Sequence, residues 1–396
     1  MPNRDSNLFT RNSRSTAGFR RGQMKILIHG NLWHGSMEQS YARAFKLLGC
    51  EVVFFDPNDG DMSVYSSSTL TLWQRAIRKL KRGPLHKPRV EMANRRFVSL
   101  ARKTQPDMVW VFKGVDLTPR WVQRLRENVD GPVLVYDPDN PFIESARHWS
   151  RNVIACIPLY DCHLVYGKFL IPLLLQHKAR RVEHIPCAYD PELFGPVPTG
   201  DETHPEFECD IAFVGTWDAE REHWLSLLAQ RFRVSIWGNE WEHCQDPRVA
   251  SCWKRKPVYG QDFARVCRTA KLSFNYVRTE NNRSSHNMRT FEIPACGGLA
   301  FTNRTEEQTA FFKEDEEMVC FDSESELLSK ASSLLENPDR IRVMKRQALA
   351  AGRAHTYQKR AATICDIAQD LSAKTRSTKC SEEAALRPPV RTPGTL

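Results

Sequence analysis

Short apolar runs alternate with amphipathic helical patterns along the chain from Met24 onward. In the first half, the pattern predicts strands at 25–29, 51–55, 108–112 and 133–136, and shorter ones near 162–165 and 182–185. Between the first two runs, residues 37–48 carry apolar side chains at helical spacing and end at Gly49. Because consecutive parallel strands need a crossover helix, this β-α-β order predicts a parallel sheet.

The same alternation restarts in the second half. Predicted strands lie at 210–214, 233–237, 272–277, 299–302 and 318–321, and predicted helices at 221–230, 261–269 and 357–371. Ser323 and Glu326 form a capping-box pattern before a further helix. The sequence therefore predicts an α/β protein with two Rossmann-like β/α/β domains that face a cleft, where ligands usually bind.

Changes in composition mark the predicted boundaries. The expected order is a disordered basic tail at 1–23, an N-terminal domain at 24–195, a linker at 196–208, a C-terminal domain at 209–356, a final helix at 357–373 and a disordered tail at 374–396. Met24, where the regular pattern begins, is a candidate true start.

Length and composition narrow the class of protein. The 396 residues suit two domains, and 41% hydrophobic and 26% charged residues are ordinary for a globular protein. The longest apolar run, 169–175, contains Pro172 and is too short to span a bilayer, and no leader-like segment follows the basic start. The 12 cysteines are scattered without a metal-ligand spacing. We therefore expect a cytoplasmic protein with reduced thiols.

One segment accounts for the net charge of +10. Residues 73–103 hold eleven Lys and Arg against the single acidic residue Glu91, on two predicted helices. This charge fits a solvated helix face, a nucleic-acid site or a surface that docks on anionic lipid at the inner face of a membrane. Trp73 and Phe97 fall on the apolar faces of these helices, whereas stacking on bases needs exposed rings, so nucleic acid is the least favoured partner.

The candidate chemistry centres on residues 287–298, which predict a short helix closed by glycines. Arg289 and Glu292 stand three residues apart and share a helix face. A carboxylate accepts hydrogen bonds from a vicinal diol, and a guanidinium grips phosphate oxygens. An ordinary surface ion pair is the alternative. The loop after the first strand lacks G-x-G-x-x-G, so nothing indicates a dinucleotide site.

Several motifs occur together in a familiar order. They are Phe213-Val214-Gly215 with Arg221, Ile236-Trp237-Gly238-Asn239, Pro257-Val258-Tyr259-Gly260, Met288 to Gly298, Phe321-Asp322-Ser323, and His355-Thr356-Tyr357 with Arg360. Over roughly 209–362 the chain resembles the glycosyltransferase group shared with the spore maturation protein CgeB. Over 24–195 the resemblance is mainly topological.

This resemblance implies a GT-B fold and a hexosyltransferase. The nucleotide-diphosphate sugar would bind the C-terminal domain, and the acceptor (an envelope, polysaccharide, lipid-linked or protein molecule) would bind the N-terminal one. It also implies a metal-independent reaction without a cofactor and a final helix that crosses back to the first domain. The donor-binding candidates are Glu292 for the ribose, with Arg289, Arg221, Arg278, Arg283, His286, Gly215 and Gly297.

Two questions stay open at this point. Related retaining enzymes often carry a second glutamate eight residues before the first; here that position is Ser284, so retention or inversion is undetermined. For the catalytic base, His29 and Asp137 are the candidates at strand ends, with His34 as an alternative. The missing glutamate also keeps open a second function: a structural or surface-layer protein that retains a GT-B shell without catalysis.

Overall fold

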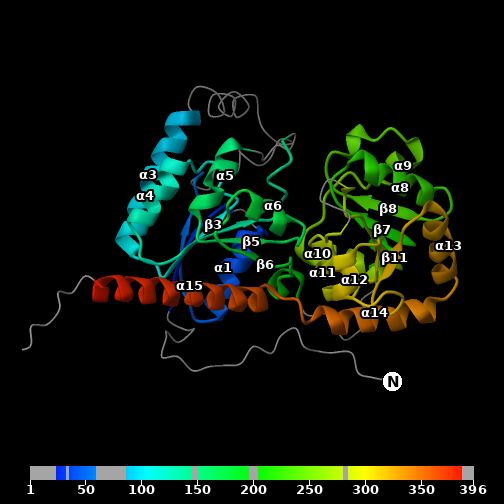
Figure 1. Cartoon of the computed structure of the whole chain (residues 1–396). Coiled ribbons are helices and arrows are strands. Elements are labelled where there is room, and N and C mark those ends of the chain that lie inside the picture. Colours follow the sequence, from blue (N-terminus) through cyan, green and yellow to red (C-terminus); the bar gives the residue numbers. More distant parts are fainter. Residues whose placement is uncertain are drawn as a thin grey trace, which may run out of the picture.

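Two parallel sheets lie side by side in the computed structural model, each covered by helices (Figure 1). The structure describes residues 24–32, 35–58, 86–144, 150–195, 204–279 and 284–385. Among these residues, no helix combines the length and the apolar character that crossing a membrane would need. The predicted α/β class with two Rossmann-like domains is confirmed.

The N-terminal sheet has six strands in the order β2-β1-β3-β4-β5-β6, all parallel. The strands are β1 Lys25–His29, β2 Glu51–Phe55, β3 Met108–Phe112, β4 Val133–Asp137, β5 Cys162–Val165 and β6 Val182–His184. The helices are α1 Met37–Leu47, α3 His86–Thr104, α4 Pro119–Glu127, α5 Arg151–Cys156, α6 Leu170–Gln176 and α7 Pro191–Phe194.

The C-terminal sheet has five parallel strands in the order β11-β10-β9-β7-β8. The strands are β7 Ile211–Val214, β8 Val234–Trp237, β9 Leu272–Asn275, β10 Ala300–Asn303 and β11 Val319–Phe321. The helices are α8 Ala219–Ala229, α9 Pro247–Cys252, α10 Gly260–Thr269, α11 Arg289–Ala295, α12 Glu306–Phe311, α13 Glu324–Leu335 and α14 Pro338–Gly352.

Central strands are buried on both faces, which explains their unbroken apolar sequences. In β3, Trp110 packs into one hydrophobic cluster, whereas Val109 and Val111 pack into another on the opposite face. Successive strand side chains point to opposite faces, so both faces of this strand need apolar residues. The core therefore sits above and below each sheet and leaves the strand ends for ligands.

Helix α15, Tyr357–Ala385, leaves the C-terminal half and lies along the N-terminal half, where it packs against α1 (Figure 1). Its first residue stacks edge-on against Tyr41 of α1, with ring centroids 4.8 Å apart. Further along, Arg181 donates to Asp370 at 2.5 Å. Helix α15 thus ties the two halves together.

The prediction of a disordered tail from residue 374 is wrong for 374–385, because α15 continues to Ala385. This stretch lacks glycine and proline, and Lys374 pairs with Asp370 one turn earlier at 3.1 Å. Residues rich in alanine, lysine and glutamate extend a helix at little cost.

The other predicted elements agree with the structure only in part. Helices α4, α5, α6, α7, α9 and α12 were not predicted. Strands β1, β2, β3 and β5 have the predicted bounds, and the other seven differ by one or two residues at one or both ends. Within the predicted linker, Phe207 is buried, with its ring 6.0 Å from Trp237 of β8. The predicted tail at 1–23, the first basic helix, linker residues 196–203 and the tail beyond 385 lie outside the described residues.

Candidate functional site

A cavity of about 550 Å³ opens between the two sheets and is lined by both halves of the chain. Its walls are built largely from loops at the carboxyl ends of the strands, where open α/β sheets bind ligands. On the N-terminal side these include residues after β1, β3, β4, β5 and β6. On the C-terminal side they include Arg221 in the first turn of α8, loop residues before α10 and after β9, and the start of α11.

Helix α11 places Glu292 on this cavity. The side chain is 8% exposed and forms an ion pair with Arg289, whose guanidinium lies 4.1 Å from the centre of the Phe263 ring. Both charged side chains line the cavity. The pair is therefore not a solvated surface pair: the carboxylate and the guanidinium are held together at a cavity wall that is largely shielded from solvent.

The end of α11 explains why Gly297 follows it. The N–H of Gly297 donates to Pro294 O at 2.9 Å, and that of Gly298 to Ile293 O at 3.0 Å, the pattern of a Schellman cap. Gly297 has φ of 80°, which favours glycine. Gly297 is not among the cavity-lining residues, so its visible role is to end the helix.

Two further arginines line the C-terminal wall, Arg221 and Arg278. Arg221 lies in the first turn of α8, where its N–H donates to the cap residue Asp218 at 2.9 Å. Its side chain donates to Thr216 O at 2.8 Å, and its Nε lies 3.1 Å from Asp218 Oδ2. These contacts hold the guanidinium at the cavity, over the Phe213 ring. With Arg289, the wall gathers three arginines.

His286 also reaches the cavity wall, but both ring nitrogens are engaged. Nε2 accepts the backbone N–H of Cys187 at 3.0 Å, so Nδ1 carries the proton and donates to Glu307 Oε2 at 2.6 Å. Burial lowers the pKa of His286, although Glu307 opposes this shift. The imidazole is thus a neutral positioning group in this structure.

The N-terminal wall contains charged residues that the sequence analysis did not identify. Lys113, after β3, pairs with Asp139 at 2.5 Å, and Glu38 in the first turn of α1 accepts the N–H of Asn31 at 3.2 Å. Burial raises the pKa of Glu38. Burial disfavours the charge of Lys113, but nearby carboxylates, led by Asp139, outweigh this and raise its pKa. In the sequence, the only sign that Lys113 and Glu38 could line a site is that each follows a predicted strand.

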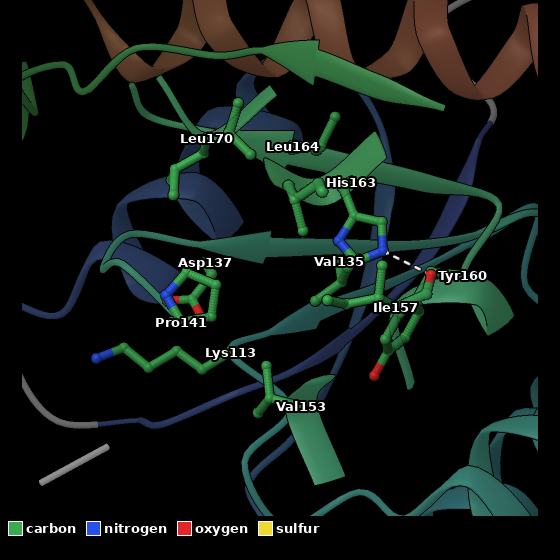
Figure 2. A pocket seen from close by; sticks show the side chains of 12 residues that line it. Lys113, Val135, Asp137, Pro141, Val153, Ile157, Tyr160, His163, Leu164 and Leu170 are labelled. Carbon is green, nitrogen blue, oxygen red and sulfur yellow. Dashed lines mark hydrogen bonds between the residues drawn. The ribbon is translucent and has the colours of Figure 1, made fainter. Parts of the chain in front are cut away.

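Asp137, one of the two predicted catalytic residues, lines a different and much smaller cavity of about 20 Å³. Figure 2 shows Asp137 beside Pro141, with Lys113 extending past it; Lys113 lines both cavities. Burial raises the pKa of Asp137 to about 7, and Lys113 opposes the shift. Asp137 itself does not line the large cavity, but it lies beside residues that do: Lys113, and Asp139, whose N–H donates to Asp137 Oδ1 at 3.0 Å.

The remaining predicted residues lie elsewhere. His29 is 4% exposed, is not among the cavity-lining residues, and has its ring 4.7 Å from Phe97. Gly215 does not line the cavity either; its carbonyl accepts from Trp241 at 2.9 Å. His34 and Arg283 lie outside the described residues.

Among the described residues, one cluster has the composition of a metal site: His184, His286 and Glu307, with ligand atoms within 4.8 Å of one another. The atoms that would face a metal already make hydrogen bonds. His184 Nε2 lies 2.8 Å from Tyr166 O, and Glu307 is bonded to His286. The cluster is satisfied as a hydrogen-bond network without a metal.

Comparisons with known proteins agree with this geometry. Residues 221–366 match a family model described as glycosyl transferase-like, and no curated protein matches the sequence. Sucrose-phosphate synthase from Thermosynechococcus elongatus aligns with a TM-score of 0.62 at 14% identity, over 89% of this chain and 100% of its own. A trehalose 6-phosphate synthase from Burkholderia multivorans aligns at 0.59 and 12%, over 90% and 100%.

Anabaena HepE, solved with UDP and glucose, aligns with a TM-score of 0.54 at 12% identity, over 87% of this chain and 99% of its own. The likeness to these structures establishes the GT-B fold, and the family match places a glycosyltransferase-like domain over 221–366.

Proposed function

We propose that this protein is a glycosyltransferase that moves a hexose from a nucleotide-diphosphate sugar to an acceptor hydroxyl. The observation that carries the proposal is the cavity wall on which Glu292 lies beside Arg221, Arg278 and Arg289. All four residues fall within the segment that matches the glycosyl transferase-like family. HepE, a structure with the same fold, was solved with UDP and glucose, which supports a uridine nucleotide as the first donor to test.

In this proposal, each side chain has a role that follows from its chemistry. The Glu292 carboxylate accepts hydrogen bonds from the two ribose hydroxyls. The arginines neutralise the diphosphate, and they matter most when the bond from the anomeric carbon to the diphosphate oxygen breaks and that oxygen gains charge. The acceptor oxygen then bonds to the anomeric carbon, and its proton passes to the departing diphosphate oxygen or to solvent. Fixed cations in a partly dry cavity need little rearrangement to stabilise this leaving group.

Calorimetric titration with UDP-glucose and other nucleotide sugars tests the proposal. We expect one nucleotide sugar to bind, and Glu292→Gln to weaken its affinity by about 10-fold to 100-fold because hydrogen bonds to a charged carboxylate are lost. Glu306→Gln, at an exposed position of α12, is the matched control and should bind normally. Unchanged donor affinity in folded Glu292→Gln protein would contradict the role of this carboxylate.

The same titration separates the enzyme from the second candidate, a structural protein that retains the shell without catalysis. A non-catalytic shell needs no affinity for a nucleotide sugar, so absence of binding across the panel would favour it. The open cavity with paired carboxylate and arginines supports the catalytic alternative. We also propose that the chain lies within the CgeB-like group, on the motifs from Met288 to Gly298.

Metal independence is a further part of the proposal. Three arginines supply the positive charge that a metal ion would otherwise bring to the diphosphate. Transfer should therefore continue in excess EDTA. Loss of activity with EDTA, and its return with a divalent cation, would show that the cluster of His184, His286 and Glu307 or another site takes a metal.

We further propose that the outer face of the N-terminal half docks on anionic lipid. Helices α3 and α4 pack together and carry exposed cations: Lys87, Arg95, Arg96, Arg102, Lys103, Arg120 and Arg124. The aromatic rings here are buried, with Trp121 at 3% and Phe97 at 0% exposure, so they offer no stacking surface for bases. Co-sedimentation should rise with the anionic lipid content of vesicles and fall in Arg95→Glu/Lys103→Glu protein. Equal sedimentation with neutral vesicles would contradict this docking.

A further inference from the structure

The two walls of the cavity differ in charge. Among the lining residues, the C-terminal wall has Arg221, Arg278 and Arg289 with one acidic residue, Glu292. The ionisable residues of the N-terminal wall are mainly acidic: Glu38, Asp139 and Asp190, with Lys113 as the cation. A ligand that spans the cavity therefore meets positive charge on one side and carboxylates on the other.

The cations on or behind the N-terminal wall are already matched. Lys113 lies 2.5 Å from Asp139, and Arg43 holds Asp190 from behind, with Nε and Oδ2 3.0 Å apart. Glu38 has no ion-pair partner among the described residues, and its carboxylate accepts the N–H of Asn31 at 3.2 Å. Among the described residues, this wall thus has a surplus carboxylate and no unpaired cation that could receive an anionic group of an acceptor.

The same wall carries a buried hydroxyl, that of Tyr166. Tyr166 is 3% exposed and lines the cavity after β5, and its Oη has no hydrogen-bond partner among the residues that the structure describes. Its ring is held edge-on by Phe169, with centroids 5.9 Å apart. Because buried polar atoms are almost always paired in folded proteins, this hydroxyl is suited to bond a polar group that enters the cavity.

We infer that the N-terminal wall accepts a hydroxyl-rich acceptor without phosphate or carboxylate groups, bonded by Tyr166 and Glu38. The inference deepens the proposed function and rests on it. A sugar hydroxyl can donate to a carboxylate and accept from a tyrosine, so both wall groups are satisfied by one neutral class of ligand. A phosphate, at up to two negative charges, would lie beside Glu38, and the described part of this wall offers it no unpaired cation.

Binding of paired sugars tests the inference. Four hexoses (glucose, galactose, mannose and N-acetylglucosamine) and their 6-phosphates are titrated by ligand-observed NMR into protein saturated with UDP. Bound UDP prevents the sugar 6-phosphates from binding to the arginines of the C-terminal wall. We expect at least one hexose to bind 10-fold or more tightly than its 6-phosphate. Tyr166→Phe should weaken the affinity for the hexose several-fold. Glu38→Gln should reduce the ratio between the dissociation constants of the 6-phosphate and the free hexose.

Glu127→Gln makes the same charge change at an exposed position of α4 and is the matched control. Equal or tighter binding of the 6-phosphates, binding of no member of the panel, or an equal effect of Glu127→Gln would overturn the inference. UDP binding is measured first in the same protein. Its absence would remove the proposed function itself, whereas normal UDP binding with the wrong sugar ranking would remove only the assignment of the acceptor.

Discussion

The buried carboxylate of Glu307 accepts the Nδ1–H of His286 at 2.6 Å, and this pair joins the two halves of the molecule. The other Glu307 oxygen accepts the backbone N–H of Lys168, after β5, at 2.7 Å. His286 in turn accepts the N–H of Cys187. Two groups of the C-terminal half thus satisfy two backbone donors of the N-terminal half, beside the cavity.

Replacing Glu307 should therefore loosen this contact. Glu307→Gln has a neutral oxygen in place of the carboxylate and brings an amide donor against other donors, so it should lower the free energy of unfolding by about 1–3 kcal/mol. Thermal unfolding at pH 7.5 measures the change, with the exposed Glu306→Gln as control. An unchanged midpoint would show that the network is dispensable for stability.

Arg289 should not tolerate lysine. Its planar guanidinium lies 4.1 Å from the Phe263 ring centre while it pairs with Glu292, and an ammonium cannot stack and pair in the same way. We expect Arg289→Lys to weaken donor affinity by about 10-fold, measured by calorimetry. Arg265→Lys, in an exposed pair on α10 with Asp262, is the control and should bind the donor normally. Equal affinities in both variants would remove Arg289 from the donor site.

Acid should destabilise the protein through its buried histidines. Burial lowers the pKa of His29 from 6.5 to about 4, so the folded state holds it neutral. The associated stability is present above pH 6.5 and is lost as the pH falls toward 4, because the unfolded state binds the proton first. By pH 4 the loss amounts to about 3 kcal/mol for this residue. His29→Phe should flatten the fall in the unfolding midpoint between these pH values.

The same variant tests the predicted catalytic role of His29. Because its ring packs against Phe97 and does not line the cavity, folded His29→Phe protein should keep transfer activity. Complete loss of transfer without loss of donor affinity would instead restore His29 as a candidate base.

Asp137 should make the protein less stable as the pH rises, the opposite pH dependence to that of His29. Burial raises its pKa from 3.8 to about 7, so the ionised form is disfavoured in the folded state. The resulting cost is absent below pH 3.8 and grows as the pH rises toward 7. Asp137→Asn should therefore raise the unfolding midpoint at pH 8 and change it little at pH 4. A midpoint that falls at pH 8 would show that the charge of Asp137 is needed beside Lys113.

Gly297 gives a test that separates a structural role from a binding role. At φ of 80°, alanine is strained, so Gly297→Ala should destabilise the protein by about 1 kcal/mol. Donor affinity in the folded fraction should stay unchanged because Gly297 does not line the cavity. Weakened donor binding at full stability would contradict the structural assignment and restore the predicted donor contact.

The sequence by itself determined the alternation of strands and helices and the local form of the 287–298 segment. Strand periodicity and the glycine stop of α11 are local properties, set by burial of adjacent side chains and by backbone conformation. The position of Arg289 and Glu292 on one helix face also followed from spacing alone.

Only the tertiary structure decided which side chains meet in the cavity. Glu38, Lys113, Asp139 and Tyr166 lie on α1 and on loops after three different strands, and no spacing along the chain links them. His29 illustrates the converse, because a strand-end position could not reveal that its ring turns toward Phe97. The direction of a side chain at a strand end depends on which face the neighbouring helix covers, and long-range packing sets that.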